Sequence, residues 1–151
     1  MITVKQERLT PALAEELLPF FVEHYIEIAH DKTVKLSPDW EQYYKLDAAS
    51  VLQVFIARDE EGTLLGYVVY FVTQNLHYKE LRQAVQDLFF VDKTKRGYMV
   101  GIKLLKISEE ILRNIGVQSI QQHVKLAHDF SPLLERQGYE QVEKLFIKRI
   151  D

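Results

Sequence analysis

The chain of 151 residues contains no cysteine. Disulfide bonds, zinc sites built on thiolates and a cysteine nucleophile are therefore excluded, and the sequence predicts no metal site. No apolar run reaches the length that spans a membrane, and the N-terminus lacks the apolar core of a signal peptide. These absences predict a cytoplasmic protein with no membrane partner.

An overall excess of positive charge is also missing, because 19 Lys and Arg face 22 Asp and Glu and the net charge is -3. A dedicated nucleic-acid-binding protein usually carries a strong basic field, so nucleic acid is not expected as a partner. Hydrophobic residues make up 47% of the chain, and a chain of this length can bury one good core. There is no linker, repeat or low-complexity segment. We therefore expect a single domain over residues 1–151.

Hydrophobic periodicity divides this domain into strands and helices. Thr10 and Pro11 are typical of a helix start, whereas Pro19 predicts a kink or a break in that helix. Ser37 and Pro38 predict the start of a second helix. The whole pattern gives the order β-α-α-β-β-β-α-β-α-β. The expected strands lie at residues 1–8, 52–58, 64–72, 81–91, 119–125 and 139–150, and the later helices at residues 101–115 and 132–138.

Residues 88–115 form the most informative stretch of the sequence. An apolar strand at residues 88–91 runs into a short basic loop, and an amphipathic helix follows at once. Such a strand, glycine-containing loop and helix offer backbone N–H groups and a positive helix end to a pyrophosphate. The stretch therefore indicates a phosphate-bearing cofactor, and the alternative is a basic solvated turn. The loop contains Lys93, Lys95, Arg96, Gly97 and Gly101.

Three segments together resemble the GNAT N-acetyltransferase superfamily. Residues 87–91 are similar to its fourth strand, and residues 96–101 match its acyl-CoA loop, (Q/R)-x-x-G-x-(G/A). Residues 133–139, LLERQGY, are similar to its late motif L-Y-E-K-x-G-F. The loop departs at Met99, where the family has its first glycine, and Gly97 is expected to supply the flexibility. The resemblance implies an α/β (α+β) GNAT-like fold with a mixed, mostly antiparallel sheet whose fourth and fifth strands splay apart.

The resemblance also implies acetyl-CoA as the cofactor. In the family, pantetheine pairs with the exposed edge of the fourth strand, which is residues 89–91 here. The N–H groups of residues 99–102 would point at the pyrophosphate, aided by the helix dipole. Three basic side chains near these groups, at positions 95, 96 and 103, would add positive charge. The implied cofactor-binding residues are Phe89, Phe90, Val91, Lys95, Arg96, Gly97, Tyr98, Met99, Val100, Gly101, Ile102 and Lys103.

Direct acetyl transfer to an amine needs a group that takes a proton from the ammonium, and sometimes an acid for the leaving thiolate. Asp87 is the candidate base, and a structural hydrogen bond is the alternative role for it. The family's usual acid, a tyrosine of the late helix, is replaced by Leu134. His128 could serve as acid or base near neutral pH, or it could be a surface residue beside a helix start. Tyr139 falls on an aromatic position that is normally core in the family.

In this fold the N-terminal helices usually shape the acceptor pocket. Their aromatic residues could hold an amine or a cation, although at helical spacing such residues are more often core or a dimer interface. Glu23, Glu27 and Asp31 form an acidic stripe that could attract a cationic acceptor, with a solvated helix face as the default. A histidine in these regions can equally be packed or solvent-facing. The candidate acceptor-binding residues are His24, Tyr25, His77 and His123.

The sequence thus predicts an N-acetyltransferase that moves acetyl from acetyl-CoA to a primary amine of a small molecule, a protein lysine or an N-terminus. A non-catalytic GNAT-like binding protein and a nucleic-acid-modifying relative are the alternatives. Residues 122–136 also look like acetyltransferase-like proteins encoded by bacteriophages. The aromatic-rich helices or the final strands could form a homodimer.

Overall fold

A five-stranded sheet forms the centre of the computed structural model, which describes residues 1–97 and 99–151. The strands lie in sequence order, so each strand pairs with the next one along the chain. The first three pairings are antiparallel, and the last strand is parallel to its neighbour. The strands are β1 (Thr3–Glu7), β2 (Leu52–Arg58), β3 (Leu64–Gln74), β4 (Arg82–Val91) and β5 (Ser119–Gln121).

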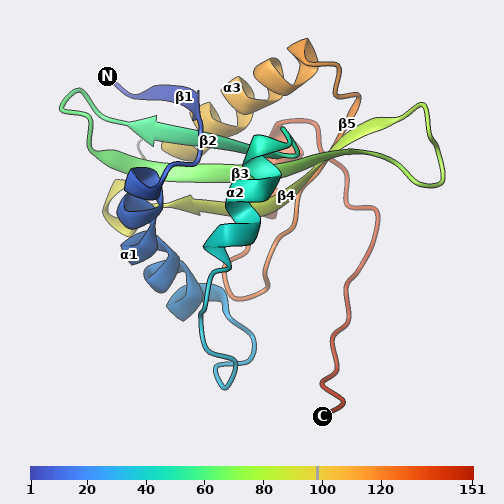
Figure 1. Ribbon diagram of the computed structural model, residues 1–151, viewed down its shortest axis with the longest axis horizontal. Helices are drawn as coiled ribbons and strands as arrows, with labels where there is room; N and C mark the ends of the chain where they lie inside the picture. The colour runs from blue at the N-terminus through green and yellow to red at the C-terminus, as the bar shows by residue number, and fades with distance from the viewer. Residues whose placement is uncertain (98) are drawn as a thin grey trace.

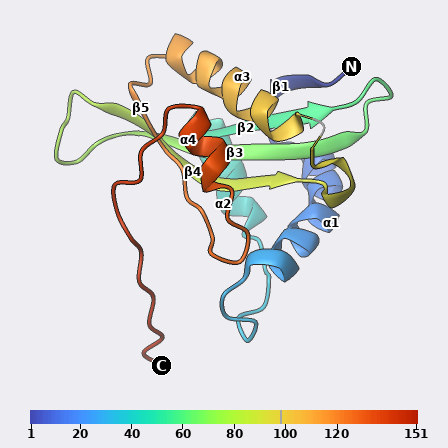
Figure 2. The ribbon, with the colours of Figure 1, turned by 180° about the vertical axis from the view of Figure 1, so that it is seen from behind.

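Helices cover both faces of this sheet. One face carries α1 and α2, and the opposite face carries α3 with the short α4, as the two views in Figures 1 and 2 show. A short 3-10 turn, η1 (Lys93–Lys95), lies between β4 and α3. The result is a three-layer arrangement in which the sheet is buried between helices. The helices are α1 (Pro11–Ile28), α2 (Trp40–Ala48), α3 (Val100–Asn114) and α4 (Ser131–Arg136).

The core is divided by the sheet into two apolar clusters. Alternate residues of β2 and β3 point to opposite faces, so each strand contributes to both clusters. Phe55 and Val68 pack with Leu104 on the α3 face, whereas Ile56 and Tyr67 pack with helix α1 on the other face. All of β2 except its last residue is buried. This explains why its sequence is a continuous apolar run in place of an alternating one.

Helix α1 begins where the sequence predicts it. Thr10 caps its N-terminus by accepting a hydrogen bond from the N–H of Leu13 at 3.1 Å, and Pro11 is the first helical residue. The predicted break at Pro19 is wrong, because α1 continues through it for 18 residues. Pro19 lies on the exposed side, and the buried Leu17 and its neighbours on the stripe hold the helix against the sheet.

Helix α2 begins later than predicted. Its first helical residue is Trp40, so Ser37 and Pro38 lie in the preceding loop. Asp39 is the N-cap, and its Oδ1 accepts a hydrogen bond from the N–H of Gln42 at 3.0 Å. An aspartate at this position satisfies one of the free N–H groups of the first turn and therefore fixes the start of the helix.

The C-terminal part of the chain departs from the predicted pattern. Strand β5 ends at Gln121, and the strand expected at residues 139–150 is absent from the described chain. Residues 140–151 instead lead away from the sheet in an extended path (Figures 1 and 2). A strand needs the backbone of a neighbouring strand for its hydrogen bonds, and this segment has none beside it. Its exposed apolar side chains are Val142, Leu145, Phe146, Ile147 and Ile150.

None of the helices in residues 1–97 and 99–151 combines the length and the hydropathy needed to cross a membrane.

The position of Pro19 predicts a simple gain of stability. Inside a helix, proline removes one backbone hydrogen bond and strains the preceding turn. We expect Pro19→Ala to raise the free energy of unfolding by about 1–3 kcal/mol, measured by urea unfolding with an unchanged m-value. The matched control is Pro38→Ala in the loop, for which no gain is expected. An equal or lower midpoint for Pro19→Ala would contradict this account of α1.

Candidate active site

A β-bulge in β4 sets the direction of Asp87. Val69 pairs with Leu88 and the next residue, Tyr70, pairs with Gln86, so Asp87 has no partner on β3. An extra residue in one strand breaks the alternation of side chains. As a result Asp87 faces α2, on the same side as its neighbour Leu88. The sequence predicted an unbroken strand here and could not show this turn of the side chain.

Strands β4 and β5 part directly beside the bulge. Their parallel pairing covers three residue pairs and ends at Val85 and Gln121. Beyond that point a side chain takes over, because Oε1 of the buried Gln86 accepts a hydrogen bond from the N–H of His123 at 2.6 Å. The predicted splay of the fourth and fifth strands is therefore present. It leaves the edge of β4 from Asp87 onward without a neighbouring strand.

One cavity, which we call the acceptor pocket, opens at this split and has a volume of about 310 Å³. It brings together three of the residues predicted from sequence, His24, His123 and His128, with Asp87. The α1 and α2 face, the split strands and the turn at residues 125–128 all contribute to its wall. Its lining residues are His24, Ile28, Phe71, Val85, Gln86, Asp87, Phe89, His123, Lys125, His128 and Phe130.

Asp87 is the carboxylate of the acceptor pocket. Burial raises its pKa above the ordinary value for aspartate, and the hydroxyl of Tyr43 opposes this by donating a hydrogen bond to Oδ2 at 2.8 Å. The charges of His123 and Lys125 also act to lower the pKa. A carboxyl group with a raised pKa in a cavity is suited to take up a proton.

His24 is a neutral member of the acceptor pocket wall. It is 7% exposed, and burial lowers its pKa to about 4. Its Nδ1 lies 3.5 Å from the hydroxyl of Tyr67, and its ring packs 5.1 Å from the ring of Phe90. His24 therefore carries no positive charge at neutral pH and contributes shape and a polar nitrogen to the wall.

A second cavity, which we call the loop pocket, lies between β4 and the N-terminus of α3 and has a volume of about 350 Å³. It contains most of the residues that the resemblance assigned to the cofactor. The two pockets share Phe89, His128 and Phe130, and the rings of Phe89 and Phe130 lie 4.9 Å apart. The loop pocket is lined by Glu27, Phe89, Phe90, Val91, Arg96, Gly97, Met99, Val100, Gly101, Ile102, His128, Phe130 and Leu133.

The N-terminus of α3 borders on the loop pocket, and no side chain among the described residues caps it. Met99 occupies the N-cap position and makes no side-chain cap hydrogen bond. The first turn of a helix leaves its N–H groups without partners inside the helix, so this end can bind an anion. A Cβ added at Gly101 would lie 3.4 Å from Phe89 and 3.5 Å from Leu133, so a glycine here keeps the floor of the loop pocket open. These features fit a pyrophosphate group.

The backbone of the loop is left-handed at two places. Gly97 has a φ of +93° and Met99 a φ of 67°. Gly97 was expected to take over the role of the family's first glycine. Both residues are left-handed, so Met99 itself still adopts a conformation that favours glycine at this position. Met99 pays a steric penalty that glycine avoids. Tyr98, also assigned to the cofactor by the resemblance, lies outside the described residues.

The basic side chains of the loop are not all directed at the pyrophosphate position. Arg96 makes two hydrogen bonds to the carboxylate of Glu27 on α1, at 2.9 and 2.8 Å, and a third to the carbonyl of Val91. Lys103 donates to the carbonyl of Ile2 at 3.3 Å. Arg96 nevertheless lines the loop pocket, and the role of Arg96 and Lys103 beside the phosphates stays a prediction. Lys95 is exposed and stays a candidate.

Glu27 lies close to several basic side chains. Besides Arg96, Nζ of Lys93 lies 3.9 Å and Nδ1 of His128 lies 4.0 Å from its carboxylate. Burial acts to raise the pKa of Glu27, but the hydrogen bonds and charge of Arg96 outweigh it and hold the pKa below the ordinary value. Within the acidic stripe predicted on this helix, Glu27 is therefore engaged with the loop, whereas Glu23 is exposed.

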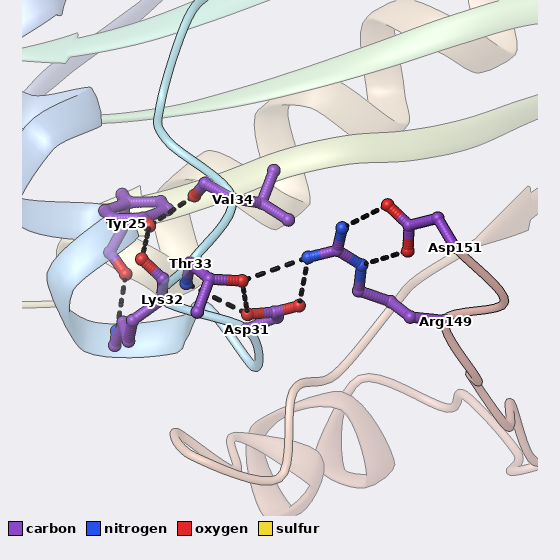
Figure 3. A network of polar contacts seen from close by, with 7 residues as sticks. All are labelled: Tyr25, Asp31, Lys32, Thr33, Val34, Arg149 and Asp151. Atoms are coloured by element: carbon purple, nitrogen blue, oxygen red, sulfur yellow. Dashed lines mark hydrogen bonds and ion pairs between the residues drawn. The ribbon is translucent and has the colours of Figure 1, made fainter.

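Tyr25 and His77 lie outside the acceptor pocket, contrary to the prediction. The hydroxyl of Tyr25 donates to the carbonyls of Lys32 and Val34 and so holds the loop after α1 (Figure 3). His77 is exposed in the turn between β3 and β4, where its N–H donates to Asn75. Residue type and approximate position suggested both. Tyr25 lies on α1 on a different side from the buried His24, and the direction of His77 depends on a turn that the sequence does not reveal.

The residues of the late motif divide between core and surface. Leu134, at the position of the family's tyrosine acid, is 7% exposed and belongs to the buried residues of the chain. Tyr139 lies away from both pockets, where its hydroxyl accepts a hydrogen bond from Gln122 at 3.4 Å. No group of three or more His, Asp or Glu side chains in residues 1–97 and 99–151 could hold a metal ion.

Sequence reasoning missed three contributors to the pockets. Tyr43 was seen as a member of an aromatic cluster, and its role as hydrogen-bond donor to Asp87 depends on the bulge. Phe130 and Lys125 belong to an irregular segment after β5, which ends at Gln121 although the sequence predicted a strand as far as Lys125. Their closeness to the candidate His123 and His128 in sequence is the one signal that could have included them.

Comparison with known proteins places this geometry in a recognised fold. No family model matches the sequence, and no curated protein matches it. Solved structures of acetyltransferases with the GNAT fold do match over nearly the whole chain. The predicted GNAT-like fold is therefore confirmed, apart from its final strand.

Three of these structures illustrate the likeness. An aminoglycoside acetyltransferase from an uncultured soil metagenomic sample, solved with sisomicin, has 16% identity and a TM-score of 0.75, over 99% of this chain and 97% of that chain. Glucosamine-6-phosphate N-acetyltransferase from Arabidopsis thaliana has 13% identity and a TM-score of 0.73, over 99% of both chains. A predicted acetyltransferase from Clostridium acetobutylicum, solved with acetyl-CoA, has 11% identity and a TM-score of 0.73, over 99% of this chain and 96% of that chain.

The left-handed conformation of Met99 predicts a stabilising substitution. Replacing it by glycine removes the clash of Cβ with the backbone, against a smaller cost in unfolded-chain entropy. We expect Met99→Gly to raise the free energy of unfolding by about 0.5–1 kcal/mol. Lys106→Gly in the exposed interior of α3 is the control and should lose about 1 kcal/mol. Equal losses in the two variants, measured by urea unfolding, would show that Met99 is not strained.

Proposed function

We propose that the protein is an N-acetyltransferase that transfers acetyl from acetyl-CoA to a primary amine. The single observation that carries this proposal is the junction of two pockets at the split between β4 and β5. The loop pocket offers an uncapped helix N-terminus, the acceptor pocket offers a half-buried carboxylate, and both border on Phe89 and His128. One ligand in each pocket would therefore meet at this point.

The residues of the loop pocket fit acetyl-CoA. The N–H groups at the start of α3 would bind the pyrophosphate, with the positive end of the helix dipole in support. The edge of β4 at residues 89–91 has no neighbouring strand and could pair with the amides of pantetheine. Acetyl-CoA, when bound, supplies the thioester that reacts with an amine.

Asp87 is the proposed base of the reaction. Its carboxylate would accept a proton from the ammonium of the acceptor, which leaves the nitrogen with a free electron pair for attack. The hydroxyl of Tyr43 holds Oδ2 of Asp87 and so fixes the direction of the carboxylate. His24, neutral and buried beside it, does not compete for the proton at neutral pH.

His128 is the proposed partner of the leaving group. It borders on both pockets, and its side chain is 42% exposed, so it can exchange protons with solvent. Its ring nitrogen could give a proton to the sulfur that departs, a task for which the family's tyrosine is absent here. Leu134 stands at the position of the family's tyrosine, is buried and has no ionisable group. An acid for the leaving group would therefore come from another residue.

A non-catalytic GNAT-like binding protein is the alternative, favoured by the same Leu134. The likeness of residues 122–136 to bacteriophage-encoded proteins stays a prediction. The protein lysine, the N-terminus and the small molecule remain the candidate acceptors.

The experiment that tests the proposed function measures release of free CoA thiol from acetyl-CoA in the presence of a panel of primary amines. The expected result is release that depends on both the amine and the protein. Binding of acetyl-CoA without release in the presence of any amine would support the binding protein and contradict the transferase.

Gly101 provides a test of the loop pocket. In Gly101→Ala the added Cβ makes ordinary contacts with Phe89 and Leu133, so the variant should fold and bind acetyl-CoA. In Gly101→Leu the longer side chain fills the space between those residues, so stabilisation by acetyl-CoA should be lost while the protein stays folded. Thermal unfolding with and without acetyl-CoA measures both. An unchanged shift in the leucine variant would place the cofactor elsewhere.

Asp87→Asn should lower kcat/KM by a factor of roughly 10²–10⁴, the range for a general base. Because burial raises the pKa of Asp87, the active carboxylate form is lost as the pH falls through that pKa, and the rate should fall with it. The variant should lack this fall of the rate at low pH, which is the acidic limb of the pH profile. Its stability should be unchanged or higher at neutral pH, because asparagine can still accept from Tyr43 and carries no buried charge. A normal rate and pH profile in Asp87→Asn would remove Asp87 from the mechanism.

Tyr43→Phe is the matched control for this pH profile. Its hydroxyl lowers the pKa of Asp87, so its removal should raise that pKa and move the acidic limb to higher pH while the base remains. A merely structural role for Tyr43 would reduce stability without moving the limb.

A further inference from the structure

The charges of the acceptor pocket distinguish between classes of amine. Asp87 is the one carboxylate among its described lining residues. Lys125 lines the same pocket, together with His123 and His128, and its ammonium is positive at neutral pH. One negative and at least one positive group therefore face the same space.

The acidic side chains of α1 and the following loop do not alter this balance. Glu27 is held by the guanidinium of Arg96 at 2.8 Å and lines the loop pocket instead. Asp31 accepts hydrogen bonds from Thr33 and from Arg149 of the C-terminal tail, outside both pockets (Figure 3). The charge of Glu27 is thus neutralised by Arg96, whereas Arg149 is shared between Asp31 and Asp151. Asp31 and the exposed Glu23 of α1 do not line the acceptor pocket, so neither adds a carboxylate to its wall.

We propose, on the basis of the proposed transferase function, that the acceptor is a small amine that also carries an anionic group, a carboxylate or a phosphate. Its ammonium is recognised at Asp87, and its anionic group is recognised at Lys125. A site that combines the half-buried Asp87 with the exposed Lys125 favours a ligand that pairs with both charges. The pocket therefore disfavours polycationic amines, which would bring several positive charges to a wall that already holds Lys125.

The size of the pocket supports a small acceptor. Its volume of about 310 Å³ lies at the lower end of ligand sites. The aromatic rings of Phe71, Phe89 and Phe130 form the apolar part of the wall and can pack against the carbon skeleton of such a molecule. An anionic amine of modest size satisfies the charges and the shape together.

The test compares matched amines by release of CoA thiol. Phenylalanine is set against phenethylamine for the carboxylate, and 2-aminoethyl phosphate against ethanolamine for the phosphate, with spermidine as the polycation. The expected result is a kcat/KM about tenfold or more higher for at least one anionic member over its neutral partner, and the lowest value for spermidine. The pair that shows the difference identifies the anionic group.

Variants of Lys125 assign the effect to this residue. Lys125→Ala should lower the ratio of kcat/KM for the anionic amine to kcat/KM for its neutral partner by about tenfold, a ratio from which any effect on Asp87 common to both amines cancels. Lys125→Glu should favour spermidine. Lys106→Ala, an exposed lysine on α3, is the control and should change neither preference.

Two results would overturn the inference in distinguishable ways. Turnover that is equal for neutral and anionic amines, or highest for spermidine, would overturn the acceptor class and leave the transferase function intact. Acetyl-CoA binding without turnover of any amine would overturn the transferase function, and the acceptor class would be overturned with it.

Discussion

The separation of β4 from β5 is the constraint on which the rest of the site depends. The two strands share three residue pairs, and the side chain of Gln86 then closes the gap by accepting the N–H of His123. Continued pairing would cover the edge of β4, and neither pocket would exist. The bulge at Asp87 lies at this same point and directs a carboxylate toward α2. A change of register of a single residue between β3 and β4 thus directs the acidic group into the opening between β4 and β5.

Electrostatic pairing then holds the two pockets in place. Glu27 joins α1 to the loop before α3 through the guanidinium of Arg96, and the ring of Phe90 lies 5.5 Å below that guanidinium. The carboxylate of Asp87 is left with a hydroxyl partner in place of a cation, so burial governs its pKa. Among their described lining residues, the two pockets therefore contain one carboxylate that is paired with an arginine, Glu27, and one that has no cation bound to it, Asp87. This difference between two neighbouring acids is the chemical basis of the proposed mechanism.

The sequence predicts the parts of the fold that local patterns determine. Strand β2 lies at the predicted residues because its apolar run is bounded by a turn at Gly62, and α3 begins within one residue of the prediction. The sequence also predicts the loop before α3 and the candidate Asp87, because a strand, a basic loop and a helix follow one another along the chain. The bulge is not predictable, because it depends on the register between β3 and β4. The final strand fails for a related reason: residues 139–150 have the composition of a strand, but a strand also requires a partner. The direction of His77 depends on a turn, which carries no periodic signal, whereas Tyr25 lies on α1 and hydrogen-bonds the loop that follows the helix.

The central claim is that the loop pocket and the acceptor pocket form one site for acetyl-CoA and an amine. Its most direct test is a thermal unfolding titration of the unmodified protein with acetyl-CoA, with CoA as the positive comparison and ATP as the control for phosphate alone. At about 100 times Kd, stabilisation of about 2.7 kcal/mol is expected with both CoA species and little with ATP. Equal stabilisation by ATP, or none by acetyl-CoA and CoA, would contradict the account.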